Sequence, residues 1–322
     1  MLSSEAYAEI GQDLAIVERR LHEVLQSNIP LVTEITQHPL RAGGKRLRPA
    51  LALLGGRFAQ PDDSERIIGL ATATELIHMA TLIHDDIVDR STTRRGLDTV
   101  NARWGDRMAV LAGDYLFGVA FTIVARWGNS KVISCLSECV RQMAKGEMMQ
   151  FGRVRRFKET EDDYLDWIEK KTAIFIAESA RIGALGASAA DAITRTLWSF
   201  GRALGLCFQI VDDVLDLTSS PDRLGKPAGG DVRNGVTTLP IIHALRESDE
   251  REQLKAVLSN GHDEDSFRVV LDILKRSGSL QYAVGRAAGY AAVAHNELAK
   301  LPDTPARRAL AEMTEHLLHR TH

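Results

Sequence analysis

Apolar residues run through a long central interval of this chain that contains no proline. All nine prolines lie before residue 62 or after residue 220. The interval between them is rich in Ala, Leu, Ile, Glu and Arg, which favour helices. Glycine-containing and polar segments interrupt it at residues 91–98, 128–130, 152–163 and 186–191. We find no convincing alternating strand pattern, so the sequence predicts an all-α fold, a bundle of helices around a deep apolar cavity.

Two of the apolar runs end in the same acidic pattern, Asp-Asp-x-x-Asp. The acidic residues are Asp85, Asp86 and Asp89 in the first copy and Asp212, Asp213 and Asp216 in the second. On a helix, the first and last aspartates of each copy lie one turn apart on one face. Carboxylates this close repel one another unless they are solvated, share protons or bind cations.

One such cluster alone is typical of a solvated helix end, but two identical copies indicate a shared metal site. Mg²⁺ usually takes one or two carboxylates per ion and completes its shell with waters and phosphate oxygens. The six carboxylates therefore predict several Mg²⁺ ions that hold a polyphosphate. The apolar residues before them indicate that the rest of the substrate is hydrocarbon.

Basic residues accompany the first acidic segment. Lys45 and Arg48 follow two glycines, and Arg94 and Arg95 come shortly after Asp89. Arg offers paired donors to phosphate and Lys a point charge, so these residues are candidate diphosphate ligands. Ordinary solvated basic loops are the alternative. His78, two turns before Asp85, is a further candidate, whereas His84 is expected to make only a local hydrogen bond.

Three further segments carry candidate residues. Lys171 and Thr172 precede an apolar run and are placed to reach a phosphate, and Lys226 lies in a Gly/Pro-rich loop. Residues 113–121 predict a core helix in which Asp114 is a buried or half-buried polar group that needs partners.

Composition is that of a globular protein. The chain has 322 residues, 44% of them hydrophobic, and a net charge of −3, which gives no reason to expect a nucleic-acid partner. We expect one domain over residues 1–322. The three cysteines form no metal-binding pattern and are expected to be reduced thiols, as in the cytoplasm. The N-terminus has no signal-peptide pattern and no uncharged apolar stretch could span a bilayer, so no integral membrane segment is expected.

In their order and content, these segments resemble those of the trans-type isoprenyl (polyprenyl) diphosphate synthases over almost the whole chain. The matching segments are Gly43–Pro49, Asp85–Asp89 with Arg94–Gly96, Gly113–Tyr115, Lys171–Thr172, Phe208–Gln209 with Asp212–Asp216, and Gly225–Lys226.

The resemblance implies a reaction and a role for each site residue. Successive isopentenyl diphosphate molecules would condense onto an allylic diphosphate, with farnesyl diphosphate the expected primer. The six aspartates would hold three Mg²⁺ ions that bridge the allylic diphosphate. Contacts to that same diphosphate would come from Arg94, Lys171, Gln209 and Lys226. Isopentenyl diphosphate would be held by Lys45, Arg48, His78 and Arg95.

One position departs from the pattern of this family. Many members carry a Lys in a Gly-Lys-x-Thr-Leu-Pro segment, where this chain has Val236. The catalytic large subunit (component II) of bacterial heptaprenyl diphosphate synthases also lacks that Lys, and it requires a small partner subunit. The chain resembles this subgroup most, so both a homodimer and a heterodimer with a small regulatory subunit stay open.

Small residues before the first acidic segment bear on product length. Ala80 precedes Asp85 by five residues, which places it about 7.5 Å further along a helix. In the family that the chain resembles, this position borders the tunnel into which the product grows. The adjacent Thr81 is also small, so we expect long products, heptaprenyl diphosphate first, with Phe121 as a candidate tunnel end. Hexaprenyl, octaprenyl and geranylgeranyl diphosphate are the alternatives.

Two other functions are alternatives to this one. A class I terpene cyclase usually carries an Asn/Ser/Glu-type second metal motif, and it generally lacks the basic clamp at Lys45 and Arg48. A non-catalytic subunit would not need two intact acidic segments.

Overall fold

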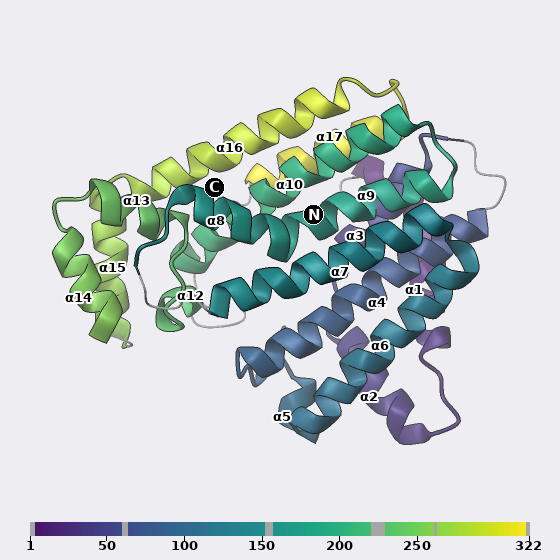
Figure 1. The fold of residues 1–322 in the computed structure, drawn as a ribbon, viewed down its shortest axis with the longest axis horizontal. Coiled ribbons are helices and arrows are strands. Elements are labelled where there is room, and N and C mark those ends of the chain that lie inside the picture. The colour runs from purple at the N-terminus through teal and green to yellow at the C-terminus, as the bar shows by residue number, and fades with distance from the viewer. Residues whose placement is uncertain (1–3, 60–63, 152–156, 220–228, 261–262, 320–322) are drawn as a thin grey trace. The chain divides into compact units, whose positions relative to one another are not determined.

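The computed structural model describes residues 4–59, 64–151, 157–219, 229–260 and 263–319 (Figure 1). The chain divides into two compact units. Unit 1 comprises residues 1–137, 178–198 and 300–313, and unit 2 comprises residues 138–177, 199–299 and 314–322. The single domain expected over residues 1–322 stays a prediction.

Unit 1 is built from the N-terminal helices and a short hairpin. Its elements are α1 (Ser4–Val24), α2 (Pro30–Arg41), α3 (Leu47–Gly56), α4 (Ser64–Val88), β1 (Thr93–Arg94), β2 (Leu97–Asp98), α5 (Val100–Trp104) and α6 (Asp106–Trp127). Both units include parts of α7 (Ser130–Phe151), α9 (Ile174–Gly186), α10 (Asp191–Thr218) and α17 (Pro305–Leu318).

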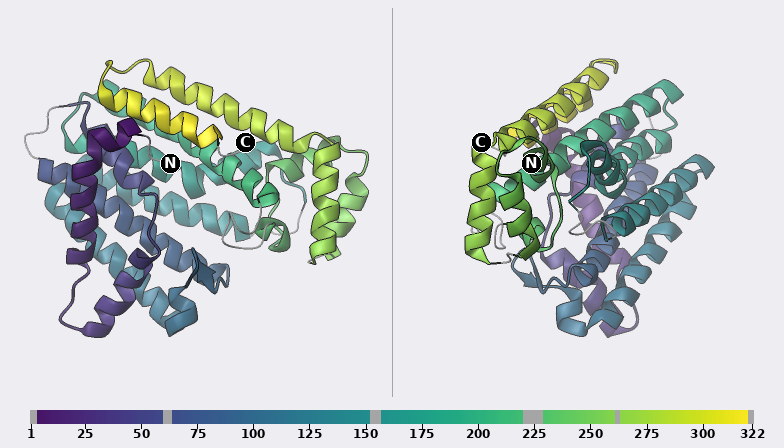
Figure 2. Two further views of the ribbon diagram at one scale, coloured as in Figure 1. Left: turned by 180° about the vertical axis from the view of Figure 1, so that it is seen from behind. Right: turned by 60° about the vertical axis from the view of Figure 1, so that its left-hand side comes forward.

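Helix α4 is the core of unit 1. Every residue from Ile67 to Ile77 is buried, which is expected of a helix that is apolar on all sides. The helix packs against α1, α3 and α6. The view from behind shows α1, in purple, on the face that Figure 1 turns away from the reader (Figure 2).

Unit 2 contains the remaining elements. They are α8 (Glu161–Ile168), the π-helix η1 (Glu169–Ala173), α12 (Gly230–Arg233), α13 (Leu239–Glu247), α14 (Arg251–Asn260), α15 (Glu264–Arg276) and α16 (Ser279–Leu298). Helix α13 packs against α8, α14, α15 and α16. An apolar cluster that includes Leu217, Ile241, Leu254, Phe267 and Ile273 fills the space between the C-terminal part of α10 and α12–α15.

The all-α prediction is confirmed. The interruption at 91–98 lies between α4 and α5, those at 128–130 and 186–191 overlap helix ends, and α8 begins at Glu161 within the one at 152–163, of which residues 152–156 lie outside the described residues. The segment 91–98 contains more order than a loop, because β1 and β2 pair as a two-residue antiparallel hairpin.

The helix predicted over residues 113–121 is present as part of α6, but the prediction that Asp114 is buried or half-buried was wrong. The Asp114 side chain is 64% exposed, and its Oδ1 lies 3.8 Å from His84 Nε2. Within the part of the chain that the structure describes, α6 is one of two helices that are long and apolar enough to cross a membrane. Only 33% of its most apolar stretch is buried, against 78% for α4. Both helices carry charged residues, so neither is an uncharged apolar stretch.

Candidate functional site

The first acidic segment lies at the C-terminal end of α4. The Asp89 amide donates to the Asp85 carbonyl at 2.8 Å, so the helical turn continues through the segment. Asp85 is partly buried, Asp86 is buried and Asp89 is exposed. The carboxylates add to the negative end of the helix dipole, and this arrangement attracts cations.

A hairpin places Arg94 beside the buried Asp86. The turn residues Arg95 and Gly96 both have positive φ, 52° and 78°, as a two-residue type I′ turn requires. Arg94 Nε lies 2.9 and 3.1 Å from the two oxygens of Asp86, and Arg94 Nη2 lies 2.7 Å from Oδ1. Burial raises the pKa of Asp86, while Arg94 opposes this rise. Both oxygens of Asp86 are therefore held by the protein.

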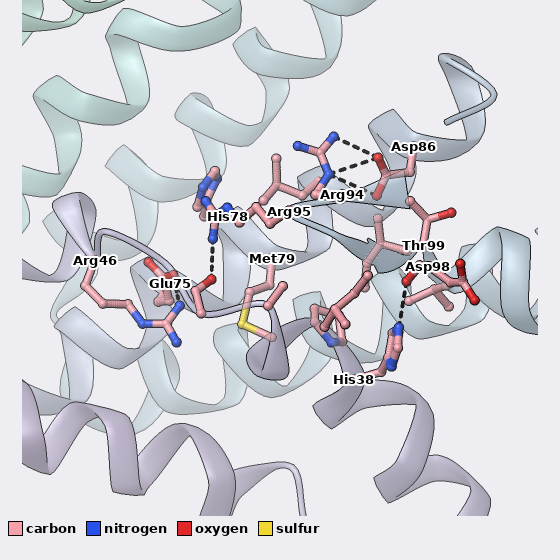
Figure 3. Close-up of a pocket in the computed structure, with 17 residues that line it drawn as sticks. His38, Arg46, Glu75, His78, Met79, Asp86, Arg94, Arg95, Asp98 and Thr99 are labelled. Atoms are coloured by element: carbon pink, nitrogen blue, oxygen red, sulfur yellow. Dashed lines mark hydrogen bonds and ion pairs between the residues drawn. The ribbon is translucent and has the colours of Figure 1, made fainter. Parts of the chain in front are cut away.

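A pocket opens between α2, α4 and the hairpin (Figure 3). Its polar lining includes His78, Asp86, Arg94 and Arg95, and its apolar lining includes Met79, Leu82, Ile83, Leu97 and Val100. His38 lies 2.7 Å from the Asp98 carbonyl oxygen and thereby ties the hairpin to α2. Four of the predicted site residues thus meet at one apolar pocket.

Arg46 supports the basic segment from inside unit 1. Its Nη1 lies 2.7 Å from Glu75 Oε1, with 8% and 5% of the two side chains exposed (Figure 3). Arg46 also pairs with Glu18. The Arg46 backbone is left-handed, with φ 46°, directly before α3. The predicted ligands Lys45, which is exposed, and Arg48, which is partly buried, flank this anchored residue.

His78 lies among these cations. Burial and the charges of Arg48, Arg95, Arg94 and Arg46 lower the pKa of His78 well below its ordinary value, so the ring is neutral at pH 7. Arg95 also donates to the Gly43 carbonyl, which joins the hairpin to the glycine segment. His84 was expected to bond locally, but its Nε2 lies 3.2 Å from the Val110 carbonyl oxygen of α6, 26 residues along the chain.

The second acidic segment lies near the C-terminal end of α10, in unit 2. Asp213 is buried and both of its oxygens accept hydrogen bonds, one from Tyr164 Oη at 2.6 Å and one from Gln209 Nε2 at 2.8 Å. Gln209 in turn accepts from Thr172 Oγ1 at 2.7 Å. Burial and the charge of Asp231 raise the pKa of Asp213 well above its ordinary value, and the two donors oppose this rise.

Lys171 and Thr172 lie in the π-helical turn η1, a feature that often marks functional sites. Lys171 Nζ pairs with Glu147 at 2.8 Å and also donates to Gln150 Oε1. Glycine at position 146 permits this arrangement, because a Cβ there would lie 2.8 Å from the Lys171 amide nitrogen. The side chain of Lys171 is thereby held toward α7.

Two backbone amides after the second acidic segment donate hydrogen bonds to Asp216. The Asp231 amide donates to the Asp216 carboxylate at 3.1 Å, and the Gly229 amide donates to the Asp216 carbonyl at 2.7 Å. Val236 lines a small cavity together with Gln150, Glu159, Tyr164, Trp167, Gly235 and Thr237. Lys226 lies outside the described residues.

The tunnel residues are placed as follows. Ala80 is fully buried on α4, and Thr81 and Phe121 are partly buried on α4 and α6. None of the three lines the pocket in Figure 3. Their role in product length stays a prediction, as does the convergence of the two acidic segments on one site.

The donor set fits Mg²⁺. Among the residues that the structure describes, no three His, Cys, Asp or Glu side chains form a ready-made metal cage. Mg²⁺ usually binds one or two protein carboxylates and takes its other ligands from water and phosphate. Asp85, Asp89 and Asp212 are the partly or fully exposed carboxylates that could supply these oxygens.

Three residues of the site were missed from the sequence: Arg46, Glu75 and Tyr164. Glu75 is a charged residue inside an apolar run, and a buried carboxylate needs a charged partner. Tyr164 lies seven residues before Lys171, a spacing of about two helical turns. Both signals are visible in the sequence, but they do not identify Arg46 or Asp213 as the partners.

An all-α fold with two helices that end in Asp-Asp-x-x-Asp is that of the isoprenoid synthases. The family model for polyprenyl synthetase matches residues 29–274. The chain therefore belongs to the polyprenyl synthetase family and is a prenyltransferase.

Individual relatives agree with this assignment. The chain is 38% identical to heptaprenyl diphosphate synthase component 2 of Geobacillus stearothermophilus, with 97% of each chain covered. It is 35% identical to nonaprenyl diphosphate synthase of Mycobacterium tuberculosis, with 97% of this chain and 94% of the relative covered. The crystal structure of a polyprenyl synthase from Caulobacter crescentus, complexed with calcium and isoprenyl diphosphate, matches with a TM-score of 0.93 at 34% identity. It covers 99% of this chain and 98% of the other.

Proposed function

We propose that this protein is an Mg²⁺-dependent, all-trans long-chain polyprenyl diphosphate synthase. It extends an allylic diphosphate such as farnesyl diphosphate by successive additions of isopentenyl diphosphate. Heptaprenyl diphosphate is the proposed product, because the relative from Geobacillus stearothermophilus bears that name. The nonaprenyl synthase among the relatives makes longer products the alternative.

One observation carries the proposal: the middle carboxylate of both acidic segments is buried and held by protein donors. Arg94 holds Asp86, and Tyr164 and Gln209 hold Asp213. Asp85, Asp89 and Asp212, which are partly or fully exposed, are then the proposed direct metal ligands. Donors that hold carboxylates in a metal site fix the orientation of those carboxylates toward the metal. The same arrangement in both segments therefore supports metal binding.

The proposed reaction follows from charge. The C1–O bond of the allylic diphosphate breaks and its electron pair leaves with the diphosphate. When bound, Mg²⁺ supplies positive charge to those oxygens. Arg94 and Lys171 are the proposed side-chain cations for the departing diphosphate. The double bond of isopentenyl diphosphate then forms the new C–C bond, and the proton lost from C2 passes to the released diphosphate.

Neutral His78 donates one ring N–H to the isopentenyl diphosphate without adding charge. The cations for that diphosphate are Lys45, Arg48 and Arg95. The apolar side chains Met79, Leu82 and Ile83 line the same pocket and exclude water from the hydrocarbon.

A second polypeptide completes the enzyme. Helix α6 exposes apolar side chains, with Leu111 60% exposed and Val110 and Tyr115 beside it. Leu111 and Tyr115 lie one turn apart, so they share a face that a partner would cover. Val236, in place of a cation, and the component 2 name of the relative favour a small regulatory subunit over a second copy. The free cysteines fit the reducing cytoplasm as the compartment.

The test is a product assay with radiolabelled isopentenyl diphosphate. The purified chain is incubated with farnesyl diphosphate and MgCl₂, alone and with candidate small subunits, and products are sized by chromatography. Long-chain product that disappears with EDTA is expected. Conversion of farnesyl diphosphate to a hydrocarbon without isopentenyl diphosphate would instead indicate a terpene cyclase. Absence of product under every condition would refute the proposal.

A further inference from the structure

Tyr164 is a buried tyrosine whose hydroxyl contacts the second acidic segment. Only 1% of its surface is exposed, and its oxygen lies 2.6 Å from Asp213 Oδ2. The ring packs edge-on against Trp167, with the ring centres 5.8 Å apart. A phenylalanine would keep that packing, so the hydroxyl and the ring can be tested separately.

The hydroxyl closes a chain of hydrogen bonds that spans three elements. Thr172 of η1 donates to Gln209, Gln209 donates to Asp213 within α10, and Tyr164 of α8 donates from the other side. Each oxygen of Asp213 therefore has one fixed donor. Together they set the rotation of the carboxylate about its Cβ–Cγ bond, which neither donor fixes alone.

Helix α8 is itself held firmly at its start. Thr160 Oγ1 accepts from the Asp163 amide at 3.2 Å and the Asp163 carboxylate accepts from the Thr160 amide at 3.1 Å, which form a capping box. Glu161 accepts from Tyr282 and Arg286 of α16. Tyr164 thus projects from a helix end that is fixed on two sides, so its hydroxyl position is well defined.

We propose that Tyr164 is a positioning residue that holds Asp213 and, through it, sets the carboxylate of Asp212 for metal and allylic diphosphate. The inference rests on the proposed function. The charge of Asp212 acts on the neighbouring Asp213 carboxylate, so a rotated or displaced Asp213 changes the charge beside Asp212. Residues that orient metal ligands typically contribute about 10–100-fold to metal affinity or activity.

The experiment compares Tyr164→Phe with a matched control, Tyr282→Phe. Both variants remove one tyrosine hydroxyl from a carboxylate of unit 2, but Tyr282 contacts Glu161, away from the acidic segment. Mg²⁺-dependent binding of a non-reactive farnesyl thiodiphosphate is measured by calorimetry, together with kinetics on the same preparations. Circular dichroism and thermal unfolding check that each variant folds.

Tyr164→Phe should weaken Mg²⁺-dependent binding about 10–100-fold and raise the Mg²⁺ needed for half-maximal rate. The KM for isopentenyl diphosphate should not change. Tyr282→Phe should behave as the wild type, because Arg286 still holds Glu161 and the start of α8. In combination with Asp213→Asn, Tyr164→Phe should add little, because both changes remove the same contact.

Three results would overturn the inference. Wild-type binding by Tyr164→Phe, with normal turnover, would refute the positioning role and leave the proposed function intact. Equal losses in both tyrosine variants would show a general effect on α8. Failure of the wild-type chain to bind the thiodiphosphate, both alone and with the candidate small subunits, would refute the proposed function and this inference together.

Discussion

Replacing Arg46 by Met removes the cation from an almost fully buried ion pair. Arg46 Nη1 lies 2.7 Å from Glu75 Oε1, and 8% and 5% of the two side chains are exposed. Removing one partner of a buried pair typically costs about 3–5 kcal/mol, because the other charge stays buried without its counterion. Against a total stability of about 5–15 kcal/mol, that loss is large.

The two single variants should differ. Arg46→Met leaves Glu75 buried without its cation and should lose about 3–5 kcal/mol. Glu75→Leu leaves Arg46 paired with Glu18, whose side chain is 38% exposed, so its loss should be smaller. The double variant removes both buried charges and should recover most of the loss, as apolar replacements of buried ion pairs often do.

Urea unfolding followed by circular dichroism at pH 7 measures these free energies. Arg57→Met is the control, because Arg57 pairs with Asp13 at the surface and should contribute less than about 1 kcal/mol. Arg46→Met should also raise the KM for isopentenyl diphosphate, since the adjacent Lys45 and Arg48 lose their anchor. The reasoning would be refuted if Arg46→Met lost less than about 1 kcal/mol of unfolding free energy. It would also be refuted if the loss in the double variant equalled the sum of the losses in the two single variants.

Three further predictions concern catalysis, product length and pH. Asp85→Asn or Asp212→Asn should abolish turnover with an unchanged helical CD spectrum, and EDTA should do the same to the wild type; near-normal Mg²⁺-dependent turnover in both variants would contradict the metal assignment. Ala80→Phe should shorten products to geranylgeranyl or farnesyl diphosphate, measured by chromatography, and an unchanged distribution would exclude Ala80 from the growth path. Burial raises the pKa of Glu178 above its ordinary value of 4.5. As the pH rises, the unfolded chain loses this proton before the folded chain does, so the stability of the wild type falls. Glu178→Gln has no such proton to lose. The melting temperature of the variant relative to the wild type should therefore be higher at pH 8 than at pH 5. An equal or smaller gain at pH 8 would contradict the shift.

The sequence alone determined the fold class, the long proline-free succession of helices and the two acidic segments. These are local properties. Proline-free apolar runs favour helices, and the spacing of Asp85, Asp86 and Asp89 fixes their relation on any helix. The prediction that Arg94 and His78 lie near the first segment also succeeded, since both are close to it along the chain.

Only the tertiary structure decided which partner each polar side chain has. Asp86 and Asp213 look like their neighbours in the sequence, yet burial and fixed donors distinguish them from Asp85, Asp89 and Asp212. Arg46 lies in a basic segment, and the sequence does not show that it pairs with Glu75, 29 residues away. The side chain of Asp114 was expected to be buried or half-buried, but it is exposed. Such contacts join residues far apart in the chain, and side-chain burial depends on packing between helices, which local spacing does not determine.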